Sequence, residues 1–164
     1  MAIVHNGIIE NFQALRGELT ELSYVFRTDT DTETVAILAT HFLAQGLPPH
    51  EVVAKALPRL DGAFALAFLF AGEHDLLIGA RRGSPLAIGY GDGEMFVGSD
   101  ALALAPLTRR ITYLEEGDWA VVTSRGRDLR RRQQPGRTAD PRGRGLGCAD
   151  RQRQLPPLHA EGDL

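Results

Sequence analysis

The sequence predicts an α+β fold in which helices come first along the chain and short strands follow. Up to about residue 57, apolar residues recur at helical spacing. From residue 63 onward, short apolar runs are separated by glycine, proline and aspartate, as in strands joined by tight turns. Helices that precede closely spaced strands favour a largely antiparallel sheet. The apolar content of 43% and the charged content of 24% are typical of a globular domain.

The first predicted element is a short strand over Ala2–His5, which is expected to end at the turn-forming pair Asn6-Gly7. A helix is predicted to follow, because apolar side chains from Ile8 to Leu22 recur every three or four positions. The chain therefore begins with one strand and one amphipathic helix.

A second helix is predicted to begin at Thr30, because a threonine followed three residues later by a glutamate, here Glu33, is a capping-box pattern. Gly46 and Pro48 are expected to end this helix. A third, shorter helix is predicted over Pro49–Leu57, and it completes the helical part of the chain.

The strands begin with Ala63–Ala71, which is almost wholly apolar and is typical of a strand buried on both faces. Asp92-Gly93 predicts a hairpin turn, and the pair Ser99-Asp100 is expected to cap a short helix over Ala101–Leu104. The shorter strand candidates are Leu76–Ala80, Leu86–Ile88, Met95–Val97, Ile111–Leu114 and Trp119–Val122.

The composition also excludes several classes of protein. No apolar run approaches the roughly 20 residues that a membrane-spanning helix needs. The N-terminus lacks the basic and apolar segments of a signal peptide. We therefore expect a cytoplasmic protein that does not interact with a membrane. The single cysteine, Cys148, cannot form an intramolecular disulfide or a metal cluster by itself.

The charge distribution divides the chain near residue 124. Residues 1–124 carry 8 basic and 16 acidic side chains, whereas residues 125–164 carry 10 arginines and 5 acidic side chains. The second segment is rich in arginine, glycine and proline and lacks the apolar residues that build a core, so we expect it to be unstructured. It contains no aromatic residue for base stacking and follows an acidic body, which argues against specific nucleic-acid binding.

Several short motifs occur in the order and spacing of one enzyme family. The segment His5–Asn11, which reads HNGIIEN, resembles class II glutamine amidotransferases, in the version found in glucosamine-6-phosphate synthases. The resemblance covers about residues 3–123. The further matching segments are Thr30–Glu33, Leu60–Ala63, Gly83–Leu86, Gly98–Asp100 and Leu114–Asp118.

The resemblance implies a fold, a reaction and partners. The fold would be part of an amino-terminal-nucleophile hydrolase, in which two antiparallel sheets are packed between helices in an αββα sandwich. The complete enzymes release ammonia from L-glutamine and pass it to a sugar-phosphate isomerase domain. That domain converts fructose 6-phosphate into glucosamine 6-phosphate for amino-sugar synthesis. The glutaminase half of such an enzyme needs no metal and no organic cofactor.

The resemblance also assigns three site residues. Asn6, through its side-chain amide, and Gly7, through its backbone N–H, match the oxyanion hole of the family, and such donors stabilise a tetrahedral intermediate. Asp31 matches the carboxylate that binds the α-amino group of glutamine. Asp29 has the same chemistry but lies outside the matching motif. His5 is interpreted as a residue that fixes the loop rather than as a catalytic base.

The nucleophile of the family is missing from this sequence. In complete members the cysteine at the mature N-terminus attacks the amide, whereas this chain begins with Met1 and Ala2. The Arg-Trp-Ala-Thr-His segment that binds the glutamine carboxylate is absent too. We therefore expect residues 1–124 to be a truncated and inactive glutaminase domain. The alternatives are a non-catalytic module that binds glutamine or a synthase, and a gene fragment with no biological role.

The segment 125–164 is consistent with a shifted reading frame. The nucleotides CTACCGCCACTTCATGCAGAAGGAGATCTA encode its last ten residues, LPPLHAEGDL. Shifted by one base, they encode YRHFMQKEI, which resembles the linker into the second domain of the synthases. Codons for Leu146–Gln154 can be chosen so that the next frame reads SAALIDNGN, which is also similar to the family. We therefore predict a one-base frameshift near residues 124–131, and the coding DNA tests this prediction.

Overall fold

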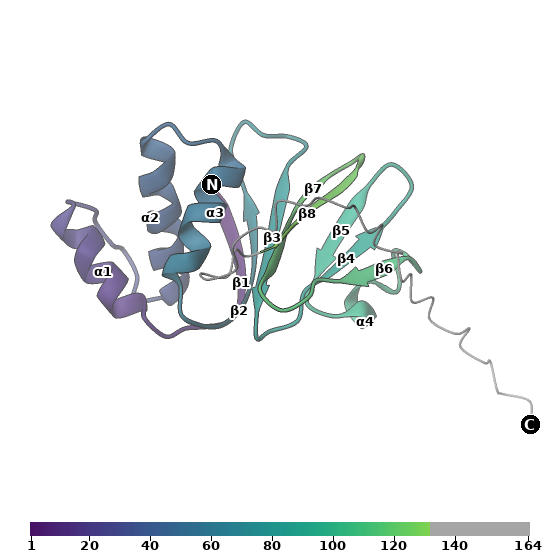
Figure 1. Ribbon diagram of the computed structural model, residues 1–164, viewed down its shortest axis with the longest axis horizontal. Coiled ribbons are helices and arrows are strands. Elements are labelled where there is room, and N and C mark those ends of the chain that lie inside the picture. Colours follow the sequence, from purple (N-terminus) through teal and green to yellow (C-terminus); the bar gives the residue numbers. More distant parts are fainter. Residues whose placement is uncertain (132–164) are drawn as a thin grey trace, which may run out of the picture.

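A computed structural model describes residues 1–131 of the chain. The helices are α1 (Phe12–Glu21), α2 (Asp31–Ala44), α3 (Pro49–Ala56) and the short α4 (Ala101–Leu104), with a 3-10 turn at Leu57–Arg59. Helices lie over one face of a five-stranded sheet, with α2 and α3 next to the sheet and α1 packed on the outer side of α2, and a three-stranded sheet packs on the other face (Figure 1). No helix among the described residues is long and apolar enough to cross a membrane.

Both sheets are antiparallel. The larger has the order β1-β2-β3-β7-β8, and the smaller has the order β5-β4-β6. Their strands are β1 (Ala2–Ile9), β2 (Gly62–Leu69), β3 (Leu77–Arg82), β4 (Ala87–Tyr90), β5 (Met95–Gly98), β6 (Ile111–Tyr113), β7 (Asp118–Thr123) and β8 (Gly126–Arg131). The predicted α+β class is therefore confirmed, and apart from β1, β8 and the start of α1, which are discussed below, the elements lie within two residues of their predicted bounds.

The core has two parts, one on each face of the larger sheet. Phe64, Leu66 and Phe68 of β2 point into the layer between this sheet and helices α1–α3. Ala65, on the opposite face of the same strand, packs in the layer between the two sheets, which Ile88 of β4 also lines. Because β2 is covered on both faces, it reads in the sequence as a continuous apolar run, as predicted.

The predicted end of the first strand is wrong. β1 does not stop at the Asn6-Gly7 pair but continues to Ile9, paired with β2 throughout. Gly7 has a φ of 122°, and a Cβ built on it would lie 2.2 Å from the carbonyl oxygen of Ala63. The glycine therefore serves close approach between two strands rather than a turn. Ile8 belongs to the strand and is 65% exposed, so the helix begins only at Phe12.

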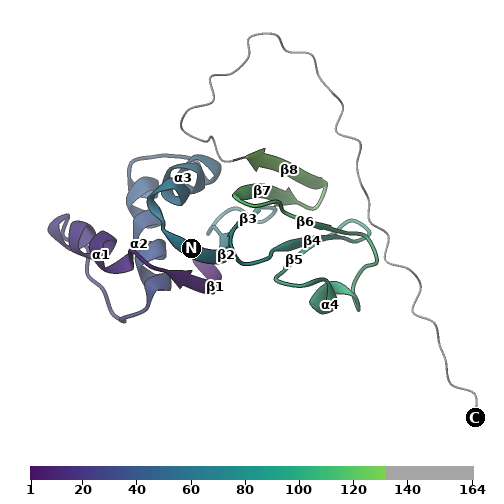
Figure 2. The ribbon, with the colours of Figure 1, turned by 60° about the horizontal axis from the view of Figure 1, so that its bottom comes forward.

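The predicted start of the unstructured segment is also wrong. Residues 126–131 were expected to lack structure, but they form β8 and pair with β7 in a hairpin (Figure 2). Gly126, with a φ of 142°, starts the returning strand. Pairing of this kind uses backbone groups, so it does not require an apolar composition. The remainder of the predicted unstructured segment, and Cys148 with it, lies outside the described residues.

Candidate functional site

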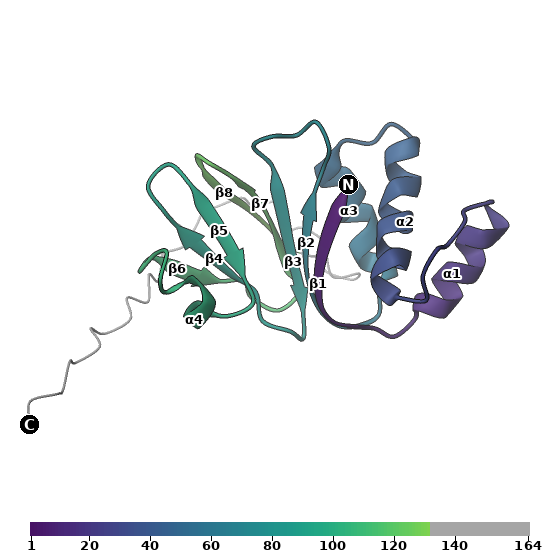
Figure 3. The ribbon, with the colours of Figure 1, turned by 180° about the vertical axis from the view of Figure 1, so that it is seen from behind.

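The predicted site residues come from β1 and from the first turn of α2. These two elements lie next to each other (Figure 3), and β1 forms one edge of the larger sheet in the described part of the chain. Three contacts join the elements: the backbone N–H of Ile9 donates to Asp31, and the ring of His5 lies against both Asp31 and Thr32. The fold thus brings residues 25 positions apart in sequence, Asn6 and Asp31, to the same end of the sheet.

Asp31 is the first residue of α2, and its carboxylate is bound to β1. Its Oδ2 accepts a hydrogen bond of 2.9 Å from the backbone N–H of Ile9, and its Oδ1 lies 3.6 Å from Nδ1 of His5. The side chain remains 22% exposed. A negative charge is also favoured at a helix N-terminus. The carboxylate is therefore held in place while part of it stays open to a ligand.

Asn6 and Gly7 are exposed on the edge strand. Side chains alternate along a strand, so the Asn6 side chain points to the face opposite His5. Among the described residues, no hydrogen bond joins Asn6 to Asp31. The structure therefore brings the Asp31 carboxylate to the strand that carries Asn6 and Gly7, without a direct contact between the predicted residues.

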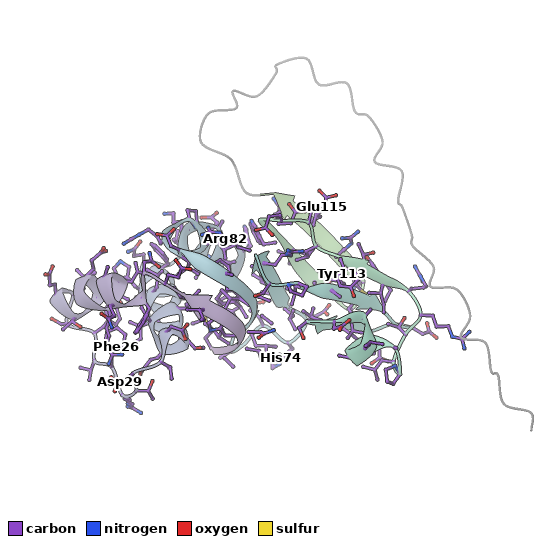
Figure 4. The ribbon with its side chains drawn as sticks, turned by 90° about the horizontal axis from the view of Figure 1, so that it is seen from below. Phe26, Asp29, His74, Arg82, Tyr113 and Glu115 are labelled. Carbon is purple, nitrogen blue, oxygen red and sulfur yellow. The ribbon has the colours of Figure 1, made fainter. Side chains whose placement is uncertain are left out.

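The structure separates Asp31 from its near neighbour Asp29. The Asp29 side chain is fully exposed and lies 3.4 Å from the guanidinium of Arg16 in α1. It stands at the outer end of the molecule near Phe26, away from the sheets (Figure 4). Asp29 is therefore not part of the β1–α2 junction, in agreement with its place outside the matching motif.

The predicted capping box at the start of α2 forms in part. The Thr30 hydroxyl accepts the backbone N–H of Glu33 at 3.3 Å, as expected. The Glu33 carboxylate, however, binds the N–H of Arg27 at 2.9 Å and both the N–H and the hydroxyl of Thr28 at 2.7 Å. These contacts tie the loop before α2 to the helix, and they fix the turn from which Asp31 projects.

Acid is expected to loosen this turn. The hydrogen bonds from the Thr28 hydroxyl and the Arg27 N–H lower the pKa of the Glu33 carboxyl. A carboxyl whose pKa is lower in the folded state adds stability above its unfolded pKa, about 4.3 for glutamate, and loses that contribution as the pH falls through the folded value. Glu33→Gln should therefore be less stable than the wild type at pH 7, and the two melting temperatures should converge as the pH falls below the lowered pKa of Glu33. A gap that is independent of pH would contradict this role of Glu33.

Two contacts of the site were missed from the sequence. One is the backbone N–H of Ile9, which no sequence signal could reveal because almost every residue has such a group. The other is the 2.9 Å hydrogen bond between Nδ1 of His5 and Oγ1 of Thr32. His5 and Thr32 both lie inside the family-like motifs of the sequence. Their proximity could therefore have been suspected, but their hydrogen bond could not.

A separate depression of about 580 Å³ lies along α1. It contains none of the predicted site residues. Its lining residues are Phe12, Gln13, Arg16, Gly17, Thr20 and Asp29.

Comparison with known proteins shows the family to which the chain is similar. The sequence profile of the glutamine amidotransferase domain matches residues 1–106. The glutamine–fructose-6-phosphate aminotransferase (isomerizing) of Mesorhizobium japonicum is 64% identical over 122 residues, which is 74% of this chain and 20% of that protein. The enzyme of the same name from Brucella abortus is 62% identical over 126 residues, 77% of this chain and 21% of that protein. The chain thus spans about one fifth of these relatives.

Solved structures of amidotransferases share the fold. The glutamine phosphoribosylpyrophosphate amidotransferase of B. subtilis, in complex with ADP and GMP, superposes with a TM-score of 0.69 at 26% identity, covering 79% of this chain and 28% of that one. A glutamine aminotransferase class-II domain protein from Silicibacter pomeroyi gives a TM-score of 0.58 at 23% identity, covering 79% of this chain and 66% of that one.

Proposed function

The chain belongs to the glutamine amidotransferase domain family, and from this premise we propose that it is part of the glutaminase domain of a glutamine–fructose-6-phosphate aminotransferase. The observation that carries the proposal is the attachment of Asp31 to β1 through the N–H of Ile9, next to Asn6 and Gly7. In the whole enzyme this part would bind L-glutamine. The ammonia released would then serve the conversion of fructose 6-phosphate into glucosamine 6-phosphate on an isomerase domain.

The open edge of β1 supports the assignment of an oxyanion hole. Successive N–H groups of a strand point to alternate sides, and the N–H of Ile9 points away from β2 toward Asp31. We infer that the N–H of Gly7, two residues earlier, faces the same open edge. A donor there, together with the side-chain amide of Asn6, would stabilise the oxyanion of a tetrahedral intermediate.

Asp31 would bind the other end of the substrate. The α-amino group of glutamine is positively charged at neutral pH, and its hydrogen bonds with a carboxylate are charge-assisted. Oδ2 accepts from the Ile9 N–H and Oδ1 from the Thr32 hydroxyl, and each carboxylate oxygen can accept a further hydrogen bond, so the exposed part of the carboxylate is the natural contact for this amine.

A polypeptide that consists of residues 1–164 supplies no N-terminal thiol. Its single cysteine, Cys148, is internal and therefore has no α-amino group of its own to act as a base. We therefore propose that this polypeptide binds glutamine without hydrolysing it. Residues 1–131 would form the folded part of the domain, and the segment that follows would be the product of the predicted frameshift.

Calorimetry and an activity assay test this proposal together. Titration with L-glutamine to millimolar concentration is expected to give saturable heat, while glutamate release stays at the rate of the buffer blank. Glutaramate, which is glutamine without its α-amino group, is the matched control ligand and should bind more weakly. Absence of heat with L-glutamine would remove the binding function, and measurable glutamate release would refute the inactivity of the chain.

A further inference from the structure

We propose that His5 is a positioning residue, which holds the Asp31 carboxylate in the orientation that receives the α-amino group of glutamine. This inference rests on the proposed function of Asp31 as the amine-binding group. It assigns His5 no contact with the reacting atoms, so His5 acts only through Asp31.

The contacts form a chain from β1 to the carboxylate. Nδ1 of His5 lies 2.9 Å from Oγ1 of Thr32, and this hydroxyl donates to Oδ1 of Asp31 at 3.4 Å. Since the hydroxyl proton is directed at Asp31, the hydroxyl oxygen accepts from His5, which assigns the Nδ1–H tautomer to the ring. The same Nδ1 lies 3.6 Å from Oδ1 of Asp31. His5 thus reaches the carboxylate through the Thr32 hydroxyl, and its ring also lies beside Oδ1.

The two carboxylate oxygens of Asp31 are held from different points of one strand. Oδ2 accepts from the backbone of Ile9, and Oδ1 faces the His5–Thr32 pair. Rotation of the carboxylate would break both contacts at once. Removal of His5 leaves Ile9 as the contact from β1, around which the carboxylate can swing.

Burial explains why His5 acts through Asp31 rather than on the substrate. Its side chain is only 5% exposed, whereas the Asp31 side chain is 22% exposed. Its Nε2 is buried and has no hydrogen-bond partner among the described residues. A buried polar atom without a partner is unfavourable, so an apolar side chain would serve a pure packing role better. The hydrogen bond from Nδ1 to Thr32 therefore explains why an imidazole stands at this position.

Two ligands and four variants, one of them a control, test the inference. His5→Leu and Thr32→Val should each weaken L-glutamine binding about tenfold, the effect of losing one net hydrogen bond, and should leave glutaramate binding unchanged. His5→Asn keeps a polar atom near the position of Nδ1 and should retain most of the affinity. His74→Leu is the matched control, because His74 is exposed in the loop between β2 and β3 (Figure 4) and should bind as the wild type does.

Hydrogen exchange at the Ile9 amide gives a readout that needs no ligand. Since this amide donates to Asp31, His5→Leu and Thr32→Val should speed its exchange, while the amides of β3 keep their wild-type rates. Equal loss of affinity for both ligands, or unchanged exchange at Ile9 in both variants, would overturn the inference. If the wild type itself binds no glutamine, the proposed function fails, and the Ile9 exchange rates still decide whether His5 positions Asp31.

Discussion

Replacement of Gly7 by alanine is expected to cause a large loss of stability. The added Cβ would lie 2.2 Å from the carbonyl oxygen of Ala63 and 2.8 Å from the Cα of Phe64, both of which are backbone atoms. The φ of 122° is one that residues with a side chain rarely adopt. We expect a loss of about 2–4 kcal/mol, from backbone strain and overpacking together.

Urea unfolding followed by circular dichroism measures this effect, and Gly17→Ala is the matched control. Gly17 lies in the interior of α1, and a Cβ built on it meets nothing within 4 Å. Alanine there should stabilise the chain by about 0.5–1 kcal/mol, because glycine is unfavourable inside a helix. If Gly7→Ala and Gly17→Ala unfold at the same urea concentration, the close approach of β1 to β2 is not as described.

Replacement of Asp31 by asparagine is expected to have the largest effect on ligand binding. Asparagine retains an oxygen that can accept the N–H of Ile9, so the junction of β1 and α2 should survive. It loses the charge that would attract the α-amino group of glutamine. A hydrogen bond to a charged group contributes about 1.5–3 kcal/mol, so the affinity for L-glutamine should fall about 10- to 100-fold.

Calorimetry of Asp31→Asn beside Asp29→Asn checks this expectation. Asp29 is two residues away and fully exposed, and it contacts Arg16 instead of β1. Its variant should bind L-glutamine as the wild type does. Wild-type affinity in Asp31→Asn, or an equal loss in both variants, would show that the negative charge of Asp31 does not hold the substrate.

Periodicity and turn chemistry predicted most of the fold but failed where backbone pairing overrides them. The Asn6-Gly7 pair has the composition of a turn, yet pairing with β2 carries the strand through it to Ile9. Ile8 falls at helical spacing with later apolar residues but belongs to that strand. In β8, an arginine-rich sequence pairs through its backbone with β7, which composition cannot reveal.

In the candidate site, too, sequence motifs predicted the residues but not the contacts between them. Asn6, Gly7 and Asp31 were assigned because whole motifs match a family, and their functional roles remain predictions. Their physical connection through the N–H of Ile9 depends on tertiary packing, so no spacing rule could supply it. The importance of Thr32 was hidden in the same way, because its contact with His5 joins residues that are 27 positions apart.

The central claim is that the open edge of β1 and the first turn of α2 hold L-glutamine in this chain. Amide NMR spectra recorded during an L-glutamine titration test it most directly. We predict saturable shifts of the Gly7 and Ile9 amides, which would share one dissociation constant with the calorimetric heat. The absence of shifts at these two amides, or shifts confined to the depression along α1 around Gln13 and Thr20, would contradict the account.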